Sequence, residues 1–566
     1  MKETCPTCHC ECSIPDASFP KCPFCGNPFL EKADAASLLN CEDGDISSVT
    51  SPNAQVDIGY CYEFGAGVEK DLDLAANWYR KAAEQGNAVG QNSLGIMYRE
   101  GLGVKQDLAE AANWFQKAAD QGYSYALDNI GLMLRDGLGV AKDLSEAVNC
   151  FKKAAEQGNP LSQNNLAQCY ENGLGVRKNI SEAVSWHKKA AEQGNAPSQY
   201  ALGIIWRDGN GTKRNLTEAF NLLLRASQQG HALAQFAICQ LYYSGVGVEA
   251  NFAQCILWCH AAAEQGDFRA QSFLGTCYEE GKGVEKNLEE AFKWYYKAAE
   301  QDERYSLRKV GSMLFNGDGT DVNLPESAKW TLRAAENGDA AMQNIYGEML
   351  LEGRAVEMDV DEANKWFKKS ADLGLAKAQF NYAESFYFGT GVEKNRAEAA
   401  KWYRKAADQG YAPAQKELAS MLYIGLGVER DYQKAFQYLK KAALQGHEES
   451  QKFLGDMYSK GMGIEENQKE AAKWYKRAAE QGVAEAQYIY GKRLLLEASG
   501  PDNIPEAIKW YIKAAEQGLK NAQYELGIFY LNGYGVAKSQ SKALELIKMA
   551  ADQGLEAAKK HLDELI

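Results

Sequence analysis

One glycine recurs every 36 residues through most of the chain, and this spacing constrains the fold more than any other feature. It closes the phrase AAEQG and stands at 86, 122, 158, 194, 230, 266, 338, 374, 410, 446, 482, 518 and 554, with Asp302 at the one remaining position of the register. A fixed period of this length, without insertions, predicts a stack of supersecondary units that bury their apolar faces against one another. A chain of 566 residues built in this way need not divide into several conventional domains.

The residues around this glycine predict where one helix of each unit begins and ends. Glycine after a run of the form AxxWYxKAA is typical of a helix end in the left-handed conformation, which Asp302 also tolerates. At the other end, a column of Asp, Asn or Ser such as Asp107 supplies N-cap residues. In 11 of the 14 units Glu or Gln follows three residues later, as at Glu110, which is the spacing of a capping box. Each unit therefore contains a helix of about 14 residues.

A second helix precedes this one in every unit. In the stretch QNSLGIMYREG, residues 91–101, the side chains of Leu94, Met97 and Tyr98 fall on one helical face. Position 95 and its equivalents are only Gly, Ala or Cys, which predicts that the two helices approach closely. A Gly-x-Gly turn joins the helices in 12 of the 14 units. We interpret these turns as structural elements and not as phosphate-binding loops.

The tryptophans and most cysteines of the repeats are predicted to be packing residues. Ten of the 11 tryptophans share one column of the register, as buried aromatic residues of a repeated core do. The cysteines of the repeats do not recur as pairs, so we expect buried, apolar thiols. Cys255, Cys259 and His260 stand close together in the sequence, but a metal cluster is the less favoured interpretation.

The repeat resembles the Sel1-like repeat family, a relative of the tetratricopeptide repeats. The resemblance is carried, within one unit, by Gln91, Leu94, Gly95, Tyr98, Gly101, Gly103, Val104, Asp107, Ala111, Trp114, Lys117, Ala118, Ala119, Gln121 and Gly122. It implies an all-α fold, a right-handed α/α solenoid or superhelix of about 14 repeats, whose first helices line a concave groove. It also implies a binding or adaptor role. We expect a head at 1–30, an acidic, Ser-rich linker at 31–53, the solenoid at 54–554 and a capping helix at 555–566.

Two C-x-x-C motifs in the head predict a metal site. Cys5 and Cys8 form the first motif, and Cys22 and Cys25 form the second, a spacing suited to one structural Zn²⁺ held by four thiolates. The pattern resembles a zinc ribbon, in which the metal would hold together a segment too short for a useful core. His9, Cys10 and Cys12 leave the exact ligand set open, and disulfides or a redox switch are the alternative.

Specificity is expected where the repeats differ, on the first-helix face spaced i, i+4, i+7. Arg99, Arg135 and Arg207 share one column there and predict a basic patch. Further along, the face turns aromatic, and arginine and aromatic residues are the types that form interface hot spots. The aromatic candidates for a partner-binding groove are Tyr200, Phe236, Tyr243, Phe315, Phe380, Tyr387, Tyr423, Tyr488 and Tyr524. The alternative is that these side chains only pad the inner surface of the solenoid.

Charge and composition narrow the function. The net charge of −14 argues against binding to nucleic acid or to an anionic membrane. The chain shows neither an apolar run long enough for a membrane helix nor a signal-peptide core, so a cytoplasmic protein is expected. We also expect a monomer. We therefore predict a non-catalytic scaffold or adaptor that binds a protein or peptide. The alternatives are a β-lactamase-like hydrolase, as attributed to some relatives, and a factor that tethers nucleic acid through the zinc head.

Overall fold

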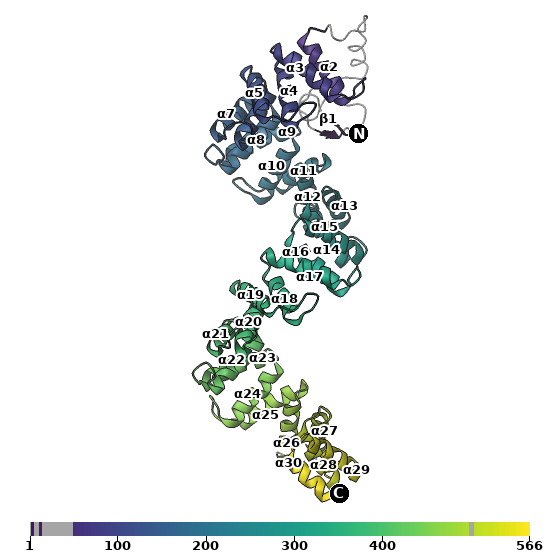
Figure 1. The fold of residues 1–566 in the computed structure, drawn as a ribbon, viewed down its shortest axis with the longest axis vertical. Coiled ribbons are helices and arrows are strands. Elements are labelled where there is room, and N and C mark those ends of the chain that lie inside the picture. Colours follow the sequence, from purple (N-terminus) through teal and green to yellow (C-terminus); the bar gives the residue numbers. More distant parts are fainter. Residues whose placement is uncertain (1, 5–10, 14–48, 497–502, 566) are drawn as a thin grey trace. The chain divides into compact units, whose positions relative to one another are not determined.

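The computed structural model describes residues 2–4, 11–13, 49–496 and 503–565. Its helices form two compact units, Met1–Glu303 and Arg304–Ile566, each containing seven repeats. Within each unit, every helix packs against the helices before and after it in the chain. The predicted all-α solenoid of repeated helix pairs is therefore confirmed (Figure 1).

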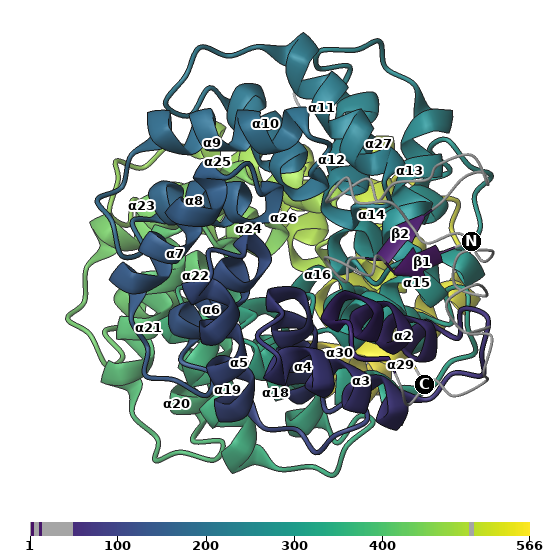
Figure 2. The same ribbon diagram turned by 90° about the horizontal axis from the view of Figure 1, so that it is seen from above.

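The helices of unit 1 alternate between first and second helices of a repeat. The first helices are α2 (Pro52–Phe64), α4 (Ala88–Glu100), α6 (Ser124–Asp136), α8 (Pro160–Asn172), α10 (Ala196–Asp208), α12 (Ala232–Ser244) and α14 (Phe268–Glu280). The second helices are α3 (Leu72–Glu84), α5 (Leu108–Asp120), α7 (Leu144–Glu156), α9 (Ile180–Glu192), α11 (Leu216–Gln228), α13 (Phe252–Glu264) and α15 (Leu288–Glu300). Within this unit the first helices lie toward the inner side of the arc, and the interhelical loops lie at its outer rim (Figure 2).

Unit 2 repeats the same pattern. Its first helices are α16 (Arg304–Asn316), α18 (Ala340–Glu352), α20 (Ala376–Phe388), α22 (Ala412–Ile424), α24 (Glu448–Lys460), α26 (Ala484–Leu496) and α28 (Lys520–Asn532). Its second helices are α17 (Leu324–Glu336), α19 (Val360–Asp372), α21 (Arg396–Asp408), α23 (Tyr432–Leu444), α25 (Gln468–Glu480), α27 (Asn503–Glu516) and α29 (Gln540–Asp552), followed by α30 (Glu556–Leu565). Near the start of the chain, β1 (Lys2–Thr4) pairs in antiparallel register with β2 (Glu11–Ser13).

The predicted caps set the bounds of the second helices. Asp107 Oδ1 accepts hydrogen bonds from the backbone N–H groups of Ala109 and Glu110, both at 3.0 Å. Gly122 follows helix α5 in the left-handed conformation with φ of 81°, and Asp302 adopts φ of 63° at the equivalent place. The first helices extend beyond the apolar stretch, and α4 begins at Ala88, three residues before Gln91. Asn87, for example, caps helix α4 by accepting from the N–H of Gly90 at 2.9 Å.

Close contacts between small and large residues hold each helix pair together. A Cβ placed on Gly95 would lie 2.7 Å from Cε1 of Phe115, so glycine is required for the observed approach. Phe115 belongs to a column of mostly aromatic residues that directly follows the tryptophan column. Trp78, in the tryptophan column, is buried, and the ammonium of Lys81 lies 3.9 Å from its ring centroid. The prediction that tryptophans pack in the core is confirmed for this column.

Glutamine side chains connect consecutive repeats. Gln121 Nε2 donates to Gln91 Oε1 at 2.7 Å, and Gln91 Nε2 donates to the carbonyl of Ala83 at 3.2 Å. The same pair of bonds recurs along both units, for example from Gln445 to Gln415 at 3.0 Å. Because the accepting glutamines, such as Gln91 and Gln415, are buried, leaving their amide oxygens unpaired would cost free energy, and the pairing fixes the register between repeats.

The described cysteines are buried free thiols, as predicted. Cys239 Sγ lies 3.1 Å from Cys255 Sγ, and Cys259 donates to the carbonyl of Ala270 at 3.3 Å. His260 points elsewhere, since its Nδ1 lies 3.2 Å from Glu264 Oε1. No helix in the described part of the chain is both long enough and apolar enough to cross a membrane.

Candidate binding surface on the first helices

The variable face of the first helices borders four hollows. We call this surface the lining face and define it by the positions equivalent to Asn92, Ile96 and Arg99. In unit 1 a hollow of about 270 Å³ lies beside Phe236, Ser272 and Thr276. In unit 2 lining-face residues contribute to hollows of about 480, 320 and 410 Å³. Concave, mixed polar and apolar surfaces of this kind are where proteins bind ligands and partner side chains.

Each arginine predicted to form a basic patch is paired with the acidic residue that follows it. Arg99 Nε lies 2.7 Å from Glu100 Oε1, and Arg99 Nη1 also donates to the amide of Asn129 at 3.0 Å. Arg135 makes two hydrogen bonds to Asp136, at 2.8 Å each, and these bonds lower the pKa of Asp136 below its ordinary value.

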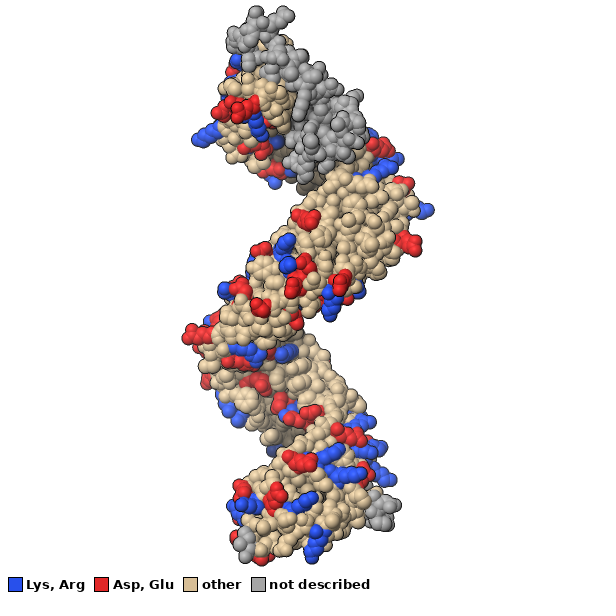
Figure 3. Space-filling model, turned by 90° about the vertical axis from the view of Figure 1, so that its right-hand side faces the viewer, with Lys and Arg blue, Asp and Glu red and all other residues tan. Residues whose placement is uncertain are grey.

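Arg207 pairs in the same way with Asp208, at 2.7 and 3.1 Å, and lowers the pKa of that carboxyl group. The arginine column therefore carries little net charge. On the face seen in Figure 3, acidic and basic side chains are interspersed over the described surface of both units.

The aromatic candidates of unit 1 form an ordered cluster with a residue that the sequence pattern did not indicate. Tyr200 stacks on His231 with ring centroids 5.0 Å apart. Phe236 and Tyr243 both contact Phe273 edge to face, at 6.2 and 5.2 Å. The missed residue is Arg269, whose guanidinium lies 5.4 Å from the ring centroid of Phe236.

Arg269 is held in place by Asp267, with Nη2 2.6 Å from Oδ2. The carboxylate of Asp267 is itself almost fully buried. The signal in the sequence was the D-x-R triplet at the start of α14, which caps a helix and orients an arginine at the same time.

The aromatic candidates of unit 2 mostly contact rings or polar groups of the neighbouring helices. Phe380 and Tyr387 both approach Tyr403, with ring centroids 5.5 and 6.3 Å away. Tyr423 lies 5.2 Å from Phe453 in the next repeat.

The remaining two tyrosines of unit 2 make polar contacts. The hydroxyl of Tyr488 donates to Glu525 at 2.6 Å, and the Tyr524 hydroxyl lies 3.3 Å from His561 Nδ1. Contacts of this kind order the side chains and agree with both alternatives, partner contact and internal padding.

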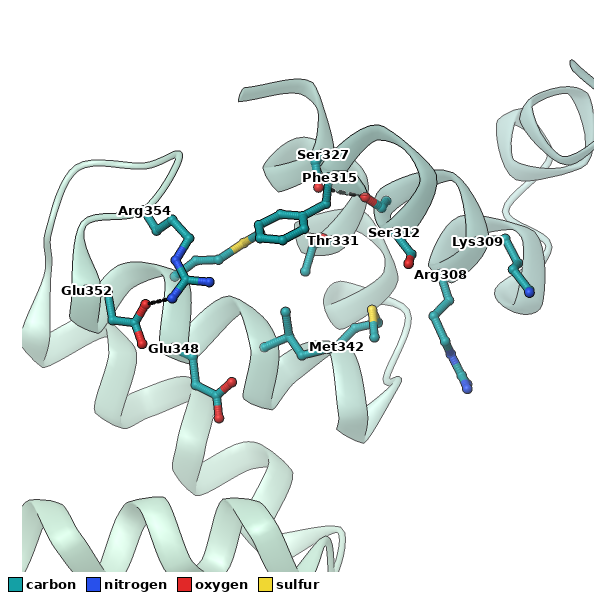
Figure 4. A pocket seen from close by; sticks show the side chains of 13 residues that line it. Arg308, Lys309, Ser312, Phe315, Ser327, Thr331, Met342, Glu348, Glu352 and Arg354 are labelled. Carbon is teal, nitrogen blue, oxygen red and sulfur yellow. Dashed lines mark hydrogen bonds and ion pairs between the residues drawn. The ribbon is translucent and has the colours of Figure 1, made fainter. Parts of the chain in front are cut away.

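Phe315, the other candidate of unit 2, borders the largest of these hollows. The pocket has a volume of about 480 Å³ and lies between helices α16, α17 and α18 (Figure 4). Its apolar wall is made by Phe315, Met342, Ile345 and Met349. The polar side chains that line it are Arg308, Lys309, Ser312, Ser327, Thr331, Glu348, Glu352 and Arg354. Arg308, Ser312 and Phe315 are the three lining-face positions of their repeat, so the pocket opens on this face.

The pocket exists because this repeat has a small side chain in a column where most repeats have an aromatic ring. In the next repeat, Phe367 packs against Gly347, so that a Cβ on this glycine would lie 2.7 Å from the ring. Thr331 stands in the same column as Phe367, and a Cβ on the equivalent glycine, Gly311, would meet no ring but the Thr331 hydroxyl oxygen, at 3.1 Å. Both Gly311 and Thr331 line the pocket.

A second substitution in the same repeat places Ser327 in a column that otherwise holds mainly Ala, and Ser327 Oγ donates to the carbonyl of Gly311 at 2.7 Å. The Ser327 hydroxyl is therefore satisfied inside the protein.

Ion pairs flank the mouth of the pocket. Arg308 Nη2 lies 2.6 Å from Asp339 Oδ2, and Glu348 pairs with Lys377 at 2.8 Å. Arg354 pairs with Glu352, and its guanidinium lies 5.9 Å from the Phe315 ring centroid, so that it covers one edge of the apolar wall (Figure 4). The mouth thus offers polar groups of both signs around an apolar interior.

One group of residues has the composition of a catalytic triad, which the sequence analysis did not find. His187 Nδ1 lies 3.2 Å from Ser198 Oγ, and His187 Nε2 lies 3.6 Å from Glu171 Oε2. However, His187 and Ser198 each have 0% exposed surface, and Ser198 Oγ donates to Asn164 at 2.9 Å. A substrate carbonyl cannot reach this hydroxyl in the observed arrangement, so the group acts as a buried hydrogen-bond network.

The predicted zinc ligands, Cys5, Cys8, Cys22 and Cys25, lie outside the described residues. Within the described part of the chain, no group of three or more His, Cys, Asp or Glu residues is placed to hold a metal ion.

Helix pairs that repeat every 36 residues, capped by Asp or Asn and by Gly, define the class of the protein as a helical-repeat solenoid. Within that class, the chain belongs to the Sel1 repeat family. The family model, described as Sel1 repeat, matches fourteen consecutive segments from 52–87 to 520–555. Sel1 repeat solenoids are generally protein-interaction scaffolds and are typically non-catalytic.

Two solved structures illustrate the similarity. The protective antigen c5321 of uropathogenic Escherichia coli, which displays an SLR fold, is 32% identical, and the match covers 84% of this chain and 99% of c5321 with a TM-score of 0.60. A Sel1 repeat protein from Oxalobacter formigenes is 30% identical over 55% of this chain and 91% of its own length, with a TM-score of 0.46. No curated protein matches the sequence.

Proposed function

We propose that the protein is a non-catalytic scaffold or adaptor that binds a protein or peptide partner on its lining face. The observation that carries this proposal is the series of hollows on that face in both units, set beside aromatic side chains and ion pairs. The second helices and the glutamine bonds between repeats supply a rigid support. The lining face varies from repeat to repeat, which is what selective recognition of one partner requires.

The proposal is tested by affinity capture with the full-length chain, followed by mass spectrometry. Tyr243→Ala and Tyr423→Ala remove one lining-face ring from each unit. The matched controls are Leu257→Ala and Leu444→Ala, which truncate side chains that are 58% and 64% exposed on second helices. We expect a partner that the wild type and both controls retain and that the lining-face variants lose. A partner that binds all four variants equally would place recognition elsewhere and contradict the proposal.

We also propose that Cys5, Cys8, Cys22 and Cys25 hold one structural Zn²⁺. The support is the donor set of four thiolates, together with the pairing of β1 with β2, because the first C-x-x-C motif lies in the sequence between these strands. The purified full-length chain should contain one zinc per molecule by elemental analysis. Cys22→Ser/Cys25→Ser should remove it, whereas Cys255→Ser should leave it unchanged. Zinc that persists in the double variant would contradict the assignment.

The cellular setting and oligomeric state belong to the same proposal. A reducing compartment, and hence the cytoplasm, is supported by the seven described cysteines, which are all buried and unpaired, including Cys239 and Cys255 at 3.1 Å. A monomer is proposed because terminal repeats and α30 can cover the ends of such a stack. Light scattering coupled to gel filtration measures the mass directly, and a mass of twice 62.5 kDa would contradict the monomer.

A further inference from the structure

We infer that the pocket between α16, α17 and α18 takes a phenylalanine or tyrosine side chain presented by the bound peptide. This inference rests on the proposed scaffold function and names the anchor that the partner supplies. The starting point is the repeat itself, because several other repeats of the protein show what fits at this place. There, a ring in the column of Thr331 lies against a glycine of the first helix, as Phe367 lies against Gly347.

The space is large enough for a ring and is lined by suitable atoms. An apolar cavity of about 150 Å³ is sufficient to bind benzene. The pocket, at about 480 Å³, leaves room for the ring and for the chain that carries it. Met342 and Met349 form part of the wall, and methionine sulfur packs favourably against aromatic rings. In the next repeat the space at Gly347 is closed by Phe367, which is 1% exposed.

The position of the mouth favours a peptide over a free aromatic molecule. The pocket opens through Arg308, Ser312 and Phe315, the lining-face residues of their repeat, and not into a closed interior. The pairs Arg308–Asp339 and Glu352–Arg354 stand at this opening, where they can exchange hydrogen bonds with the amide groups of a peptide. An apolar anchor in a pocket surrounded by polar groups is the usual arrangement of an interface hot spot.

The absence of the ring is not compensated inside the protein. Ser312, Ser327 and Thr331 add small polar side chains around the space but do not fill it. Keeping a void beside two buried methionines costs stability, which a partner that supplies the missing ring would restore. Binding of the anchor should therefore stabilise this repeat.

The test uses the full-length protein and two substitutions of Thr331. Thr331→Phe restores the ring of the column and fills the pocket, whereas Thr331→Val keeps its volume. The probe is N-acetyl-L-phenylalanine amide, observed by saturation-transfer NMR, with N-acetyl-L-leucine amide for comparison. We expect the phenylalanine probe to bind the wild type and Thr331→Val, and to bind Thr331→Phe roughly 10- to 100-fold more weakly, as the burial of one ring requires. The leucine probe should bind the wild type roughly 2- to 10-fold more weakly than the phenylalanine probe.

Three outcomes would overturn the inference. The first is that the phenylalanine probe does not bind the wild type, and the second is that it binds Thr331→Phe equally well. The third is that toluene binds the pocket while the phenylalanine amide does not. The last result would assign the pocket to a small molecule. In the capture experiment, a partner that Tyr423→Ala loses but Thr331→Phe fully retains would also contradict the proposed anchor, while the scaffold proposal would stand. As a control for folding, hydrogen exchange in α17 of Thr331→Phe should be no faster than in the wild type.

Discussion

The same substitution in two neighbouring repeats should have opposite effects on stability. Gly311→Ala and Gly347→Ala each add one methyl group at the same position of a first helix. On Gly347 the new Cβ would lie 2.7 and 2.8 Å from two atoms of the buried Phe367 ring. Overpacking of this kind costs about 3 kcal/mol, which exceeds the gain of about 1 kcal/mol from replacing a helical glycine by alanine. Gly347→Ala should therefore destabilise its repeat by about 2 kcal/mol.

On Gly311 the nearest atom to the new Cβ is the Thr331 hydroxyl oxygen, at 3.1 Å, and the next lies 3.6 Å away. Rotation of the Thr331 side chain toward the open pocket relieves this contact, so the helix-forming preference of alanine dominates. Gly311→Ala should stabilise its repeat by roughly 0.5–1 kcal/mol. The two variants thus differ by about 2.5–3 kcal/mol, which is roughly a 70- to 150-fold difference in local opening.

Hydrogen–deuterium exchange with mass spectrometry measures this difference in the full-length chain. Peptides from α16 and α18 report the two repeats separately, which global unfolding of a long repeat array does not. Exchange in α18 should become faster in Gly347→Ala, and exchange in α16 should become slower in Gly311→Ala. If Gly311→Ala speeds exchange in α16 as strongly as Gly347→Ala does in α18, the missing ring has not created usable space, and the explanation of the pocket is wrong.

Three further predictions concern the packing and the electrostatics. A Cβ on Gly103 would lie 2.0 Å from the carbonyl oxygen of Leu72 in the preceding repeat, so Gly103→Ala should strongly lower the stability measured by thermal denaturation. The control is Gly86→Ala, where a Cβ would meet nothing within 4 Å, so only the positive φ should cost about 1 kcal/mol. Ala355 adopts φ of 67°, and Ala355→Gly should raise stability by up to about 1 kcal/mol in the same assay. Burial raises the pKa of Asp128 from 3.8, so the folded state holds this proton more tightly and the stability should fall as the pH rises through the raised pKa. Asp128→Asn should remove that fall and leave the variant more stable at pH 7, as measured by thermal denaturation across this pH range.

The sequence predicted the repeated architecture in detail because its signals are local. Caps such as Asp107 and left-handed glycines such as Gly122 act within one turn of a helix, so their spacing alone defines where each second helix begins and ends. The apolar pattern did not define where the first helices begin, since the short cap at Asn87 lies before it. Position 95 was interpreted correctly as a point of close approach, although the sequence did not show that Phe115 is its partner.

The binding surface was harder to predict, because it depends on which charges neutralise one another. The arginine column suggested a basic patch, yet each arginine is followed directly by an acidic residue, as in Arg135–Asp136, and the pairing was visible in the sequence. Arg269 was missed because it comes from the position three residues before Ser272, outside the i, i+4, i+7 pattern. Contacts between repeats, such as Arg269 over Phe236, arise from stacking and not from spacing along one helix.

The pocket shows why a missing residue in a repeat column does not by itself predict a cavity. Two units carry a side chain much smaller than a ring in the column of Phe367, namely Cys259 and Thr331. At Cys259 the opposite helix supplies Cys239 where most repeats have glycine, and both thiols are fully buried in one hydrophobic cluster. At Thr331 the opposite residue remains Gly311, so nothing compensates for the lost volume and the space stays open. A cavity therefore forms only where both members of a packing pair are small, so two columns of the repeat must be considered together. At Thr331 both members are small, and the volume that a ring would fill in the core is open to the lining face.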